Sequence, residues 1–264
     1  MSDTRIIAIA NQKGGVGKTT TAINLATALA AIGETVLVMD IDPQGNASTG
    51  LGIDRNKRPL SSYDVIVSGA SVNDAALETE VPNLYVVPST LDLLGIEMEI
   101  APANDRIQRL QKALRKNPMV TEKFSYILID CPPSLNLLTL NAMGAANSVL
   151  VPLQCEFLAL EGLSQLLETV KQVRSSLNPD LEIQGIVLTM YDGRNNLSNQ
   201  VVEDVRSFMG DKVYQTVIPR NVRVSEAPSF GKPALLYDLK CAGSQAYLQL
   251  ASEVIQRERQ LRAA

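Results

Sequence analysis

The segment NQKGGVGKTT (residues 11–20) constrains the fold of this chain more than any other stretch. The apolar, β-branched run RIIAIA (residues 5–10) precedes it, and residues 17–32 follow with alanine and leucine at helical spacing. A strand, a glycine-rich turn and a helix in this order aim backbone N–H groups and the positive end of the helix at one point. The segment therefore predicts a phosphate-binding loop.

This loop is a variant of the pattern Gly-x-x-x-x-Gly-Lys-[Ser/Thr], because Lys13 stands where the pattern has its first glycine. We expect Lys18 to neutralise charge on the β- and γ-phosphates and the Thr19 hydroxyl to hold Mg²⁺. A glycine-rich turn with an incidental lysine is the alternative, which the flanking strand and helix disfavour. The residues predicted to bind the cofactor here are Lys13, Gly14, Gly15, Val16, Gly17, Lys18, Thr19 and Thr20.

Three aspartates follow predicted strands, namely Asp40 and Asp42 in VMDIDPQGN and Asp130 in ILIDCPPS. The carboxyl ends of parallel strands open into one crevice, so all three side chains could face the nucleotide. Asp130 is the expected Walker B carboxylate for Mg²⁺. Asp40 is predicted to join the metal shell and Asp42 to position the attacking water. For each of them a helix cap or a turn is the alternative.

The rest of the chain alternates between apolar strand-like runs and helical patterns. Strands are expected at 5–10, 35–40, 83–88, 126–130, 148–152, 183–190 and 212–219, and helices at 17–32, 89–116, 135–146, 157–176, 197–209 and 243–261. Continuous apolar strands are typical of a parallel sheet buried on both faces. We predict one α/β domain, residues 1–264, with a doubly wound, mostly parallel sheet and helices on both faces. Residues 52–82 are interpreted as surface elaboration.

Composition excludes several classes of function. The formal net charge is −4, so any contact with nucleic acid must be local. The absence of histidine excludes His-based acid/base catalysis. Cys131, Cys155 and Cys241 have no metal-ligand spacing. No leader and no apolar run of ~20 residues is seen, so we expect a cytoplasmic protein without a membrane span.

Four ordered motifs together resemble the ParA/Soj family of bacterial partition ATPases, within the deviant Walker A group of P-loop NTPases. They are the loop with Lys13, DIDPQGN (40–46), LIDCPPS (128–134) and VIPRNVRVSEAPSFGKP (217–233). The resemblance implies ATP and Mg²⁺ as cofactors and a sandwich homodimer in the ATP-bound state. It implies that Lys13 reaches the phosphates of the partner subunit. Without the resemblance, the sequence would favour an exposed loop lysine with no partner.

By the same resemblance, Lys13, Lys18, Asp42 and Asp130 form the catalytic set, and Gly14 lies at the dimer interface. A cation supplied in trans contributes roughly 10³–10⁵ in rate in other phosphate-transfer systems. The adenine base is expected against the residues that match the family's strand-to-loop segments, although ordinary core and turn roles remain equally open for them. These residues are Met190, Pro219, Asn221 and Val222.

The resemblance also implies that the ATP-bound dimer binds double-stranded DNA without sequence preference and associates with the nucleoid. Arg194 and Arg223 match DNA-contacting arginines of the family, and Arg220 lies in the same segment as Arg223. Solvated loop charges are the alternative, because Glu226 and Asp238 are interspersed. A ParB-like partner is expected to stimulate hydrolysis, and chromosome segregation is the expected role.

Two other functions remain open at this point. Related ATPases position plasmids, chemoreceptor arrays or carboxysomes. The second alternative is a MinD-like, membrane-bound regulator of the division site. The segment VIQRERQLRAA raises the possibility of an amphipathic membrane anchor because it places Val254, Ile255 and Leu261 among basic residues. This segment lacks the bulky apolar face of a membrane anchor, so we favour a charged, solvent-facing helix end. The cysteine positions do not match the cluster-binding pattern of nitrogenase-like members.

Overall fold

The computed structural model describes residues 4–115, 117–157 and 159–263. In this part of the chain one eight-stranded sheet has the order β3-β4-β2-β5-β1-β6-β7-β8. All neighbouring strands are parallel except β3 and β4, which are antiparallel. The strands are β1 (Arg5–Ile9), β2 (Val36–Asp40), β3 (Leu77–Glu78), β4 (Leu84–Val87), β5 (Tyr126–Asp130), β6 (Ser148–Gln154), β7 (Glu182–Tyr191) and β8 (Val213–Pro219).

This architecture confirms the predicted fold class, and each predicted strand is present. The strand β3 was not predicted, because a two-residue strand carries no recognisable period. The central strands β2 and β5 are buried along their whole length, in agreement with their continuous apolar sequences.

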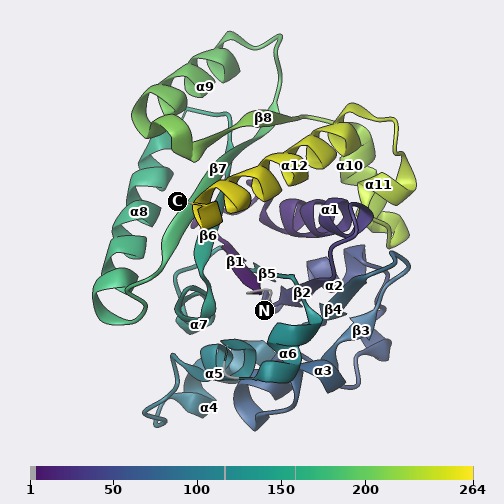
Figure 1. The fold of residues 1–264 in the computed structure, drawn as a ribbon, viewed down its shortest axis with the longest axis vertical. Helices are drawn as coiled ribbons and strands as arrows, with labels where there is room; N and C mark the ends of the chain where they lie inside the picture. The colour runs from purple at the N-terminus through teal and green to yellow at the C-terminus, as the bar shows by residue number, and fades with distance from the viewer. Residues whose placement is uncertain (1–3, 116, 158, 264) are drawn as a thin grey trace.

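The α-helices cover both faces of the sheet (Figure 1). They are α1 (Lys18–Ala31), α2 (Asn46–Gly50), α3 (Val72–Ala75), α4 (Ile96–Ile100), α5 (Arg109–Arg115), α6 (Pro118–Lys123), α7 (Leu137–Ala145), α8 (Ala159–Ser176), α9 (Asn196–Met209), α10 (Val222–Glu226), α11 (Ala234–Tyr237) and α12 (Ala242–Ala263). Short 3₁₀ or π segments are η1 (Arg55–Lys57), η2 (Asp64–Ser68), η3 (Leu91–Gly95), η4 (Gly210–Lys212) and η5 (Ala227–Phe230).

Two predictions about local structure are wrong. The single helix expected over 89–116 is divided into η3, α4 and α5. Pro102 lies between α4 and α5, where its missing N–H and its ring interrupt a helix. Residues 52–82 are more than surface elaboration, since β3 joins the sheet and Val65, Ile66 and Val72 are buried in the core.

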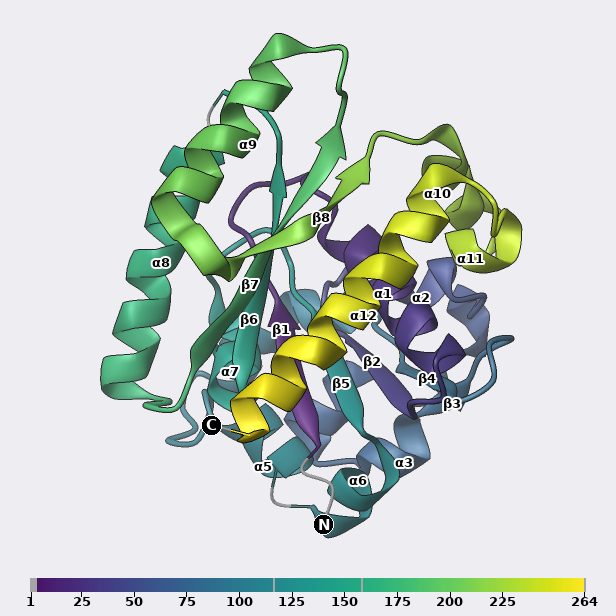
Figure 2. The same cartoon turned by 45° about the horizontal axis from the view of Figure 1, so that its top comes forward.

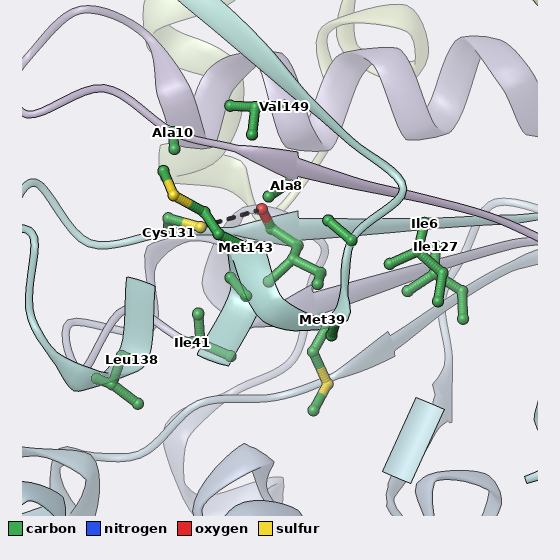
Figure 3. Close-up of a cluster of buried hydrophobic side chains, with 14 of the residues drawn as sticks. Ile6, Ala8, Ala10, Met39, Ile41, Ile127, Cys131, Leu138, Met143 and Val149 are labelled. Atoms are coloured by element: carbon green, nitrogen blue, oxygen red, sulfur yellow. Dashed lines mark hydrogen bonds between the residues drawn. The ribbon is translucent and has the colours of Figure 1, made fainter. Parts of the chain in front are cut away.

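The alternation of side chains along β1 divides the core into two layers. Ile7 and Ile9 pack with α1 and α12 on one face, and α12 runs next to α1 in Figures 1 and 2. Ile6 and Ala8 point to the other face, among residues of α5 and α7. Figure 3 shows part of this second layer, in which the Cys131 thiol donates to the Ile129 carbonyl at 3.7 Å.

A buried polar network attaches the end of α12 to the sheet. Arg5 Nε forms an ion pair with Glu258 Oε1 at 2.9 Å. Gln184 Nε2 donates to the same Glu258 oxygen at 2.7 Å. Gln184 Oε1 accepts from Arg5 Nη2 at 2.8 Å and from Ser148 Oγ at 2.6 Å. The network therefore links α12 to β1, β6 and β7.

We expect Glu258→Ala to lower the free energy of unfolding by about 2–3 kcal/mol, because it leaves Arg5 without its counter-charge in a mostly buried site. Arg259→Ala, an exposed change in the same helix, is the control and should stay within about 0.5 kcal/mol of wild type. Chemical denaturation measures both values. Equal stability of the two variants would contradict the structural role of the network.

Candidate functional site

The predicted phosphate loop connects β1 to α1 and has the backbone that its glycines require. Gly15 and Gly17 have φ angles of 77° and 90°, in the left-handed region that disfavours residues with a Cβ atom. Helix α1 begins at Lys18 without a side-chain cap and without an acidic residue in its first turn. Its first N–H groups are therefore free to bind an anion.

Neighbouring strands hold this loop in place. Asn11 Nδ2 donates to the Pro152 carbonyl of β6 at 2.8 Å, and Asn11 Oδ1 accepts from Lys13 N at 3.0 Å. Thr189 of β7 donates from its hydroxyl to the Val16 carbonyl at 2.8 Å. The loop is thus shaped by the sheet before any ligand binds.

Lys18 lies folded over the loop. Its Nζ donates to the Lys13 carbonyl at 2.9 Å, and the residue is only 7% exposed. Burial lowers the pKa of Lys18, while the nearby Asp130 carboxylate opposes that effect. A buried ammonium group of this kind is stabilised by additional negative charge, which a phosphate would supply.

Asp130 ends β5 and is completely buried. Within the described part of the chain, neither of its carboxylate oxygens has a hydrogen-bond partner. Burial, followed by the charge of Asp40, raises the pKa of Asp130 well above its usual range, and the nearby Thr19 hydroxyl lowers it without completing a regular hydrogen bond. An orphaned buried carboxylate beside a threonine hydroxyl fits a hard cation such as Mg²⁺.

The described residues contain no group of three or more histidine, cysteine, aspartate or glutamate side chains placed to hold a metal ion. This finding agrees with the way proteins bind Mg²⁺, through one or two carboxylates together with substrate phosphates and water. The predicted metal residues Thr19 and Asp130 lie next to each other, and phosphates would complete the shell.

Asp40 is the register partner of Asp130 on the neighbouring strand β2, but its surroundings differ. Its carboxylate accepts hydrogen bonds from Asp42 N at 3.2 Å, Ser48 N at 2.8 Å and Ser48 Oγ at 2.6 Å. Burial raises the pKa of Asp40 to about 6. Both oxygens thus organise the loop after β2, and a direct place in the metal shell stays a prediction.

Asp42 lies at the wall of a cavity of about 560 Å³ next to the phosphate loop. Its Oδ1 accepts from Gln44 N at 2.9 Å. Its carbonyl accepts from Ser89 Oγ and Gly45 N. The cavity is lined by Gly14, Gly15, Gly17, Lys18, Thr19, Thr20, Asp42, Pro43, Gln44, Asn46, Leu94, Pro132, Pro133, Ser134, Asn136 and Met190.

Lys13 forms an ion pair with Glu156 of its own chain. Glu156 follows β6, and the Lys13 side chain is 42% exposed. The lysine therefore has an intramolecular partner, which sequence reasoning missed because the two residues are 143 positions apart.

The predicted adenine contacts are only partly brought together. Met190 lines the cavity and has a φ angle of 52°, a strained value for a residue with a side chain. Pro219, Asn221 and Val222 do not line it. Pro219 pairs with Tyr191 at the end of the sheet, and the Asn221 side chain caps α10.

The arginines predicted to contact DNA are exposed near the ends of β7 and β8. Arg194 pairs with Asp192 at 2.8 Å and lowers the pKa of that carboxyl to about 2, with a smaller effect from Arg220. Arg223 lies 3.1 Å from Glu226 and 3.7 Å from Asp238. Both arginines that match the family therefore have acidic partners within the chain.

No helix in the described part of the chain is long and apolar enough to cross a membrane. In the C-terminal segment, Val254 is buried in the core, so it is not available to a lipid surface. The side chain of Leu261 lies outside the described residues. Among the cysteines, Cys131 and Cys155 are buried and Cys241 is half-buried.

Asp130→Asn should make ligand-free stability less dependent on pH. A carboxyl group with a raised folded pKa contributes stability that is fully present below its unfolded pKa, about 4, and lost as pH rises through the folded value. We expect the melting temperature of the variant to rise relative to wild type as the pH is increased above the unfolded pKa.

Thermal unfolding without nucleotide measures this difference, with the exposed Asp180→Asn as a control that should show no such trend. A difference between Asp130→Asn and wild type that stays constant with pH would contradict the buried charge assigned to Asp130.

Comparison with known proteins identifies the family. A family model described as an AAA domain matches residues 4–183. The chromosome partitioning protein ParA of Caulobacter vibrioides is 66% identical over 259 residues, which cover 98% of this chain and 97% of that protein. The sporulation initiation inhibitor protein Soj of Bacillus subtilis is 56% identical, with 95% of this chain and 98% of that protein covered.

Solved structures agree with this result. A Mycobacterium smegmatis protein named cobyrinic acid a,c-diamide synthase, with bound ADP and magnesium, is 36% identical with a TM-score of 0.84 and covers 97% of this chain and 96% of its own. The Pyrococcus furiosus cell division ATPase MinD is 32% identical with a TM-score of 0.77 and covers 97% and 99%. The chain therefore belongs to the ParA/Soj family of chromosome-partitioning ATPases.

Proposed function

We propose that this chain binds ATP and Mg²⁺ in the cavity beside the phosphate loop, dimerises in that state, binds DNA without sequence preference and releases it on hydrolysis. A ParB-like partner stimulates hydrolysis, and the cargo is the chromosome. The observation that carries this proposal is the buried Asp130 carboxylate, which lies beside Thr19 and Lys18 and has no hydrogen-bond partner among the described residues. Two solved structures that are 36–37% identical to this chain hold ADP or an ATP analogue together with magnesium, which supports the choice of ligands.

Four side chains at or beside the cavity have a role in this proposal. Thr19 and Asp130 would hold Mg²⁺, which would neutralise charge on the phosphate oxygens. Lys18 and the N–H groups of the loop bind the phosphates. Asp42 orients the attacking water through the carboxylate oxygen that Gln44 leaves free.

An exposed apolar side chain at the cavity supports self-association on this face. Leu94 lines the cavity and is 68% exposed, and Met98, four residues further along the chain in α4, is 83% exposed. Pairing two copies across the nucleotides would cover such residues and bring Lys13 of each subunit to its neighbour's phosphates. It would also double the arginine surface, which explains how a chain with a net charge of −4 can hold DNA.

Lys13→Ala should abolish ATP-dependent dimerisation and lower hydrolysis at least tenfold, because the cation that completes the neighbouring site is lost. Light scattering after size exclusion with ATP and Mg²⁺, and a phosphate-release assay, measure both effects. The matched control is Lys171→Ala, an exposed lysine of α8. A dimeric Lys13→Ala variant with wild-type turnover would remove the role proposed for Lys13.

Co-sedimentation distinguishes the proposed DNA binding from binding to a membrane. The ATP-bound protein should pellet with duplex DNA and lose binding as salt increases, since phosphate contacts release counterions. Liposomes containing anionic lipid should not capture it. Capture by liposomes and not by DNA would favour a MinD-like role. The assay does not identify the cargo, because a protein that positions plasmids, chemoreceptor arrays or carboxysomes would bind DNA in the same way.

Glu156→Gln should favour the ATP-bound dimer, because it releases Lys13 from its own chain. Exposed ion pairs contribute up to about 1 kcal/mol, so we expect up to about a fivefold increase in the dimerisation constant. Analytical ultracentrifugation with ATP measures it, and Glu161→Gln, an exposed change in α8, is the control. Weaker dimerisation of Glu156→Gln would mean that the carboxylate serves the dimer itself.

A further inference from the structure

Arg58 is the centre of a hydrogen-bond cluster that lies behind the cavity wall. Its Nη1 donates to the Ser89 carbonyl at 2.7 Å. Its Nη2 donates to Thr49 Oγ1 at 2.9 Å and to the Ile53 carbonyl at 2.8 Å, with a longer contact to the Gly45 carbonyl at 3.4 Å. One guanidinium group therefore ties together the end of β4 and the segment from Gly45 to Ile53.

Two short routes lead from this guanidinium to the backbone of Asp42. In the first, Arg58 binds the carbonyl of Ser89, whose hydroxyl donates to the Asp42 carbonyl at 2.5 Å. In the second, it contacts the carbonyl of Gly45, whose N–H donates to the same Asp42 oxygen at 2.9 Å. Both routes end on Asp42, which lines the cavity.

The residues around the Arg58 guanidinium group pack tightly against it. Gly45 has a φ angle of 62°, and a Cβ atom at this position would collide with Arg58 Nη1. Burial lowers the pKa of Arg58, and the Asp40 carboxylate is the largest effect that raises it. The planar fork of arginine matches several carbonyl acceptors at once, which a lysine ammonium on a flexible stem does not.

The orientation of Asp42 depends on this backbone. Gln44 N occupies one carboxylate oxygen, Oδ1, at 2.9 Å. Among the described residues the other oxygen, Oδ2, has no hydrogen bond, so it can accept one from a water molecule in the cavity. A shift of about 1 Å in such a group is enough to lower a rate by about two orders of magnitude.

We infer that Arg58 is a positioning residue for ATP hydrolysis, which holds the turn from Asp42 to Gly45 so that the free Asp42 oxygen faces the attacking water. This inference rests on the proposed function, in which Asp42 orients that water. Arg58 is not one of the residues that line the cavity, and in the described part of the chain none of its hydrogen bonds goes to a lining residue or to the phosphate loop. It acts through Ser89 and Gly45.

The test compares Arg58→Ala with Arg55→Ala in the full chain. Arg55 is an exposed neighbour with the same charge, and among the described residues it makes a single, long hydrogen bond, to the Gln44 carbonyl at 3.4 Å. With Mg²⁺ and ATP we expect kcat to fall at least tenfold in Arg58→Ala and KM to change less than threefold. Arg55→Ala should stay within twofold of wild type. Arg58→Lys should recover only part of the loss.

A double-mutant cycle with Asp42→Ala tests whether Arg58 acts through Asp42. Arg58→Ala should have no further effect on kcat in the Asp42→Ala background. An equal loss in both backgrounds would overturn the inference while leaving the role of Asp42 intact. Wild-type turnover of Asp42→Ala alone would instead overturn the proposed role of Asp42, and with it the route assigned to Arg58.

Two further measurements keep the test independent of turnover and of folding. Hydrogen exchange without nucleotide should be at least tenfold faster at residues 42–49 in Arg58→Ala than in Arg55→Ala. Equal exchange in the two variants would overturn the inference that Arg58 holds this turn. If Arg58→Ala does not fold, Ser89→Ala removes only the hydroxyl arm. It should lower kcat at least threefold with KM retained, and unchanged kcat would overturn the inference.

Discussion

The rest of the site depends on one buried acidic group, the carboxylate of Asp130. It ends the fully buried strand β5, and neither of its oxygens has a hydrogen bond to any of the described residues. Burying such a group costs several kcal/mol unless a cation or a proton compensates it. Lys18 provides part of that compensation, and burial lowers its own pKa. The ligand-free site is therefore a destabilised arrangement that metal and phosphate can complete.

The neighbouring Asp40 shows how differently the fold can treat the same residue type. Asp40 and Asp130 are register partners on adjacent strands and both are completely buried. Asp40 receives three hydrogen bonds from Asp42 and Ser48, so it stabilises the loop that carries Asp42. One carboxylate thus supports the scaffold, and the other remains available to a ligand.

The cations that the proposed function directs to other molecules are paired within this chain. Lys13 binds Glu156, Arg194 binds Asp192, and Arg223 contacts Glu226. Exposed pairs of this kind are weak, so a phosphate group can displace the carboxylate at little cost. This arrangement is consistent with a monomer that has low affinity for DNA and with a dimer that gains it from two weak surfaces.

The sequence alone determined the phosphate loop, the parallel strands and the aspartates at their ends, because these follow from local period and spacing. Only the tertiary structure decided which residues from distant segments contact one another at the site. Arg58 and Ser89 are 31 residues apart, and Lys13 and Glu156 are 143 apart, so no local pattern pairs them. The tertiary structure also decided that the Asp40 carboxylate accepts hydrogen bonds while that of Asp130 accepts none from the described residues, because the partners of a buried carboxylate depend on which loops fold over it.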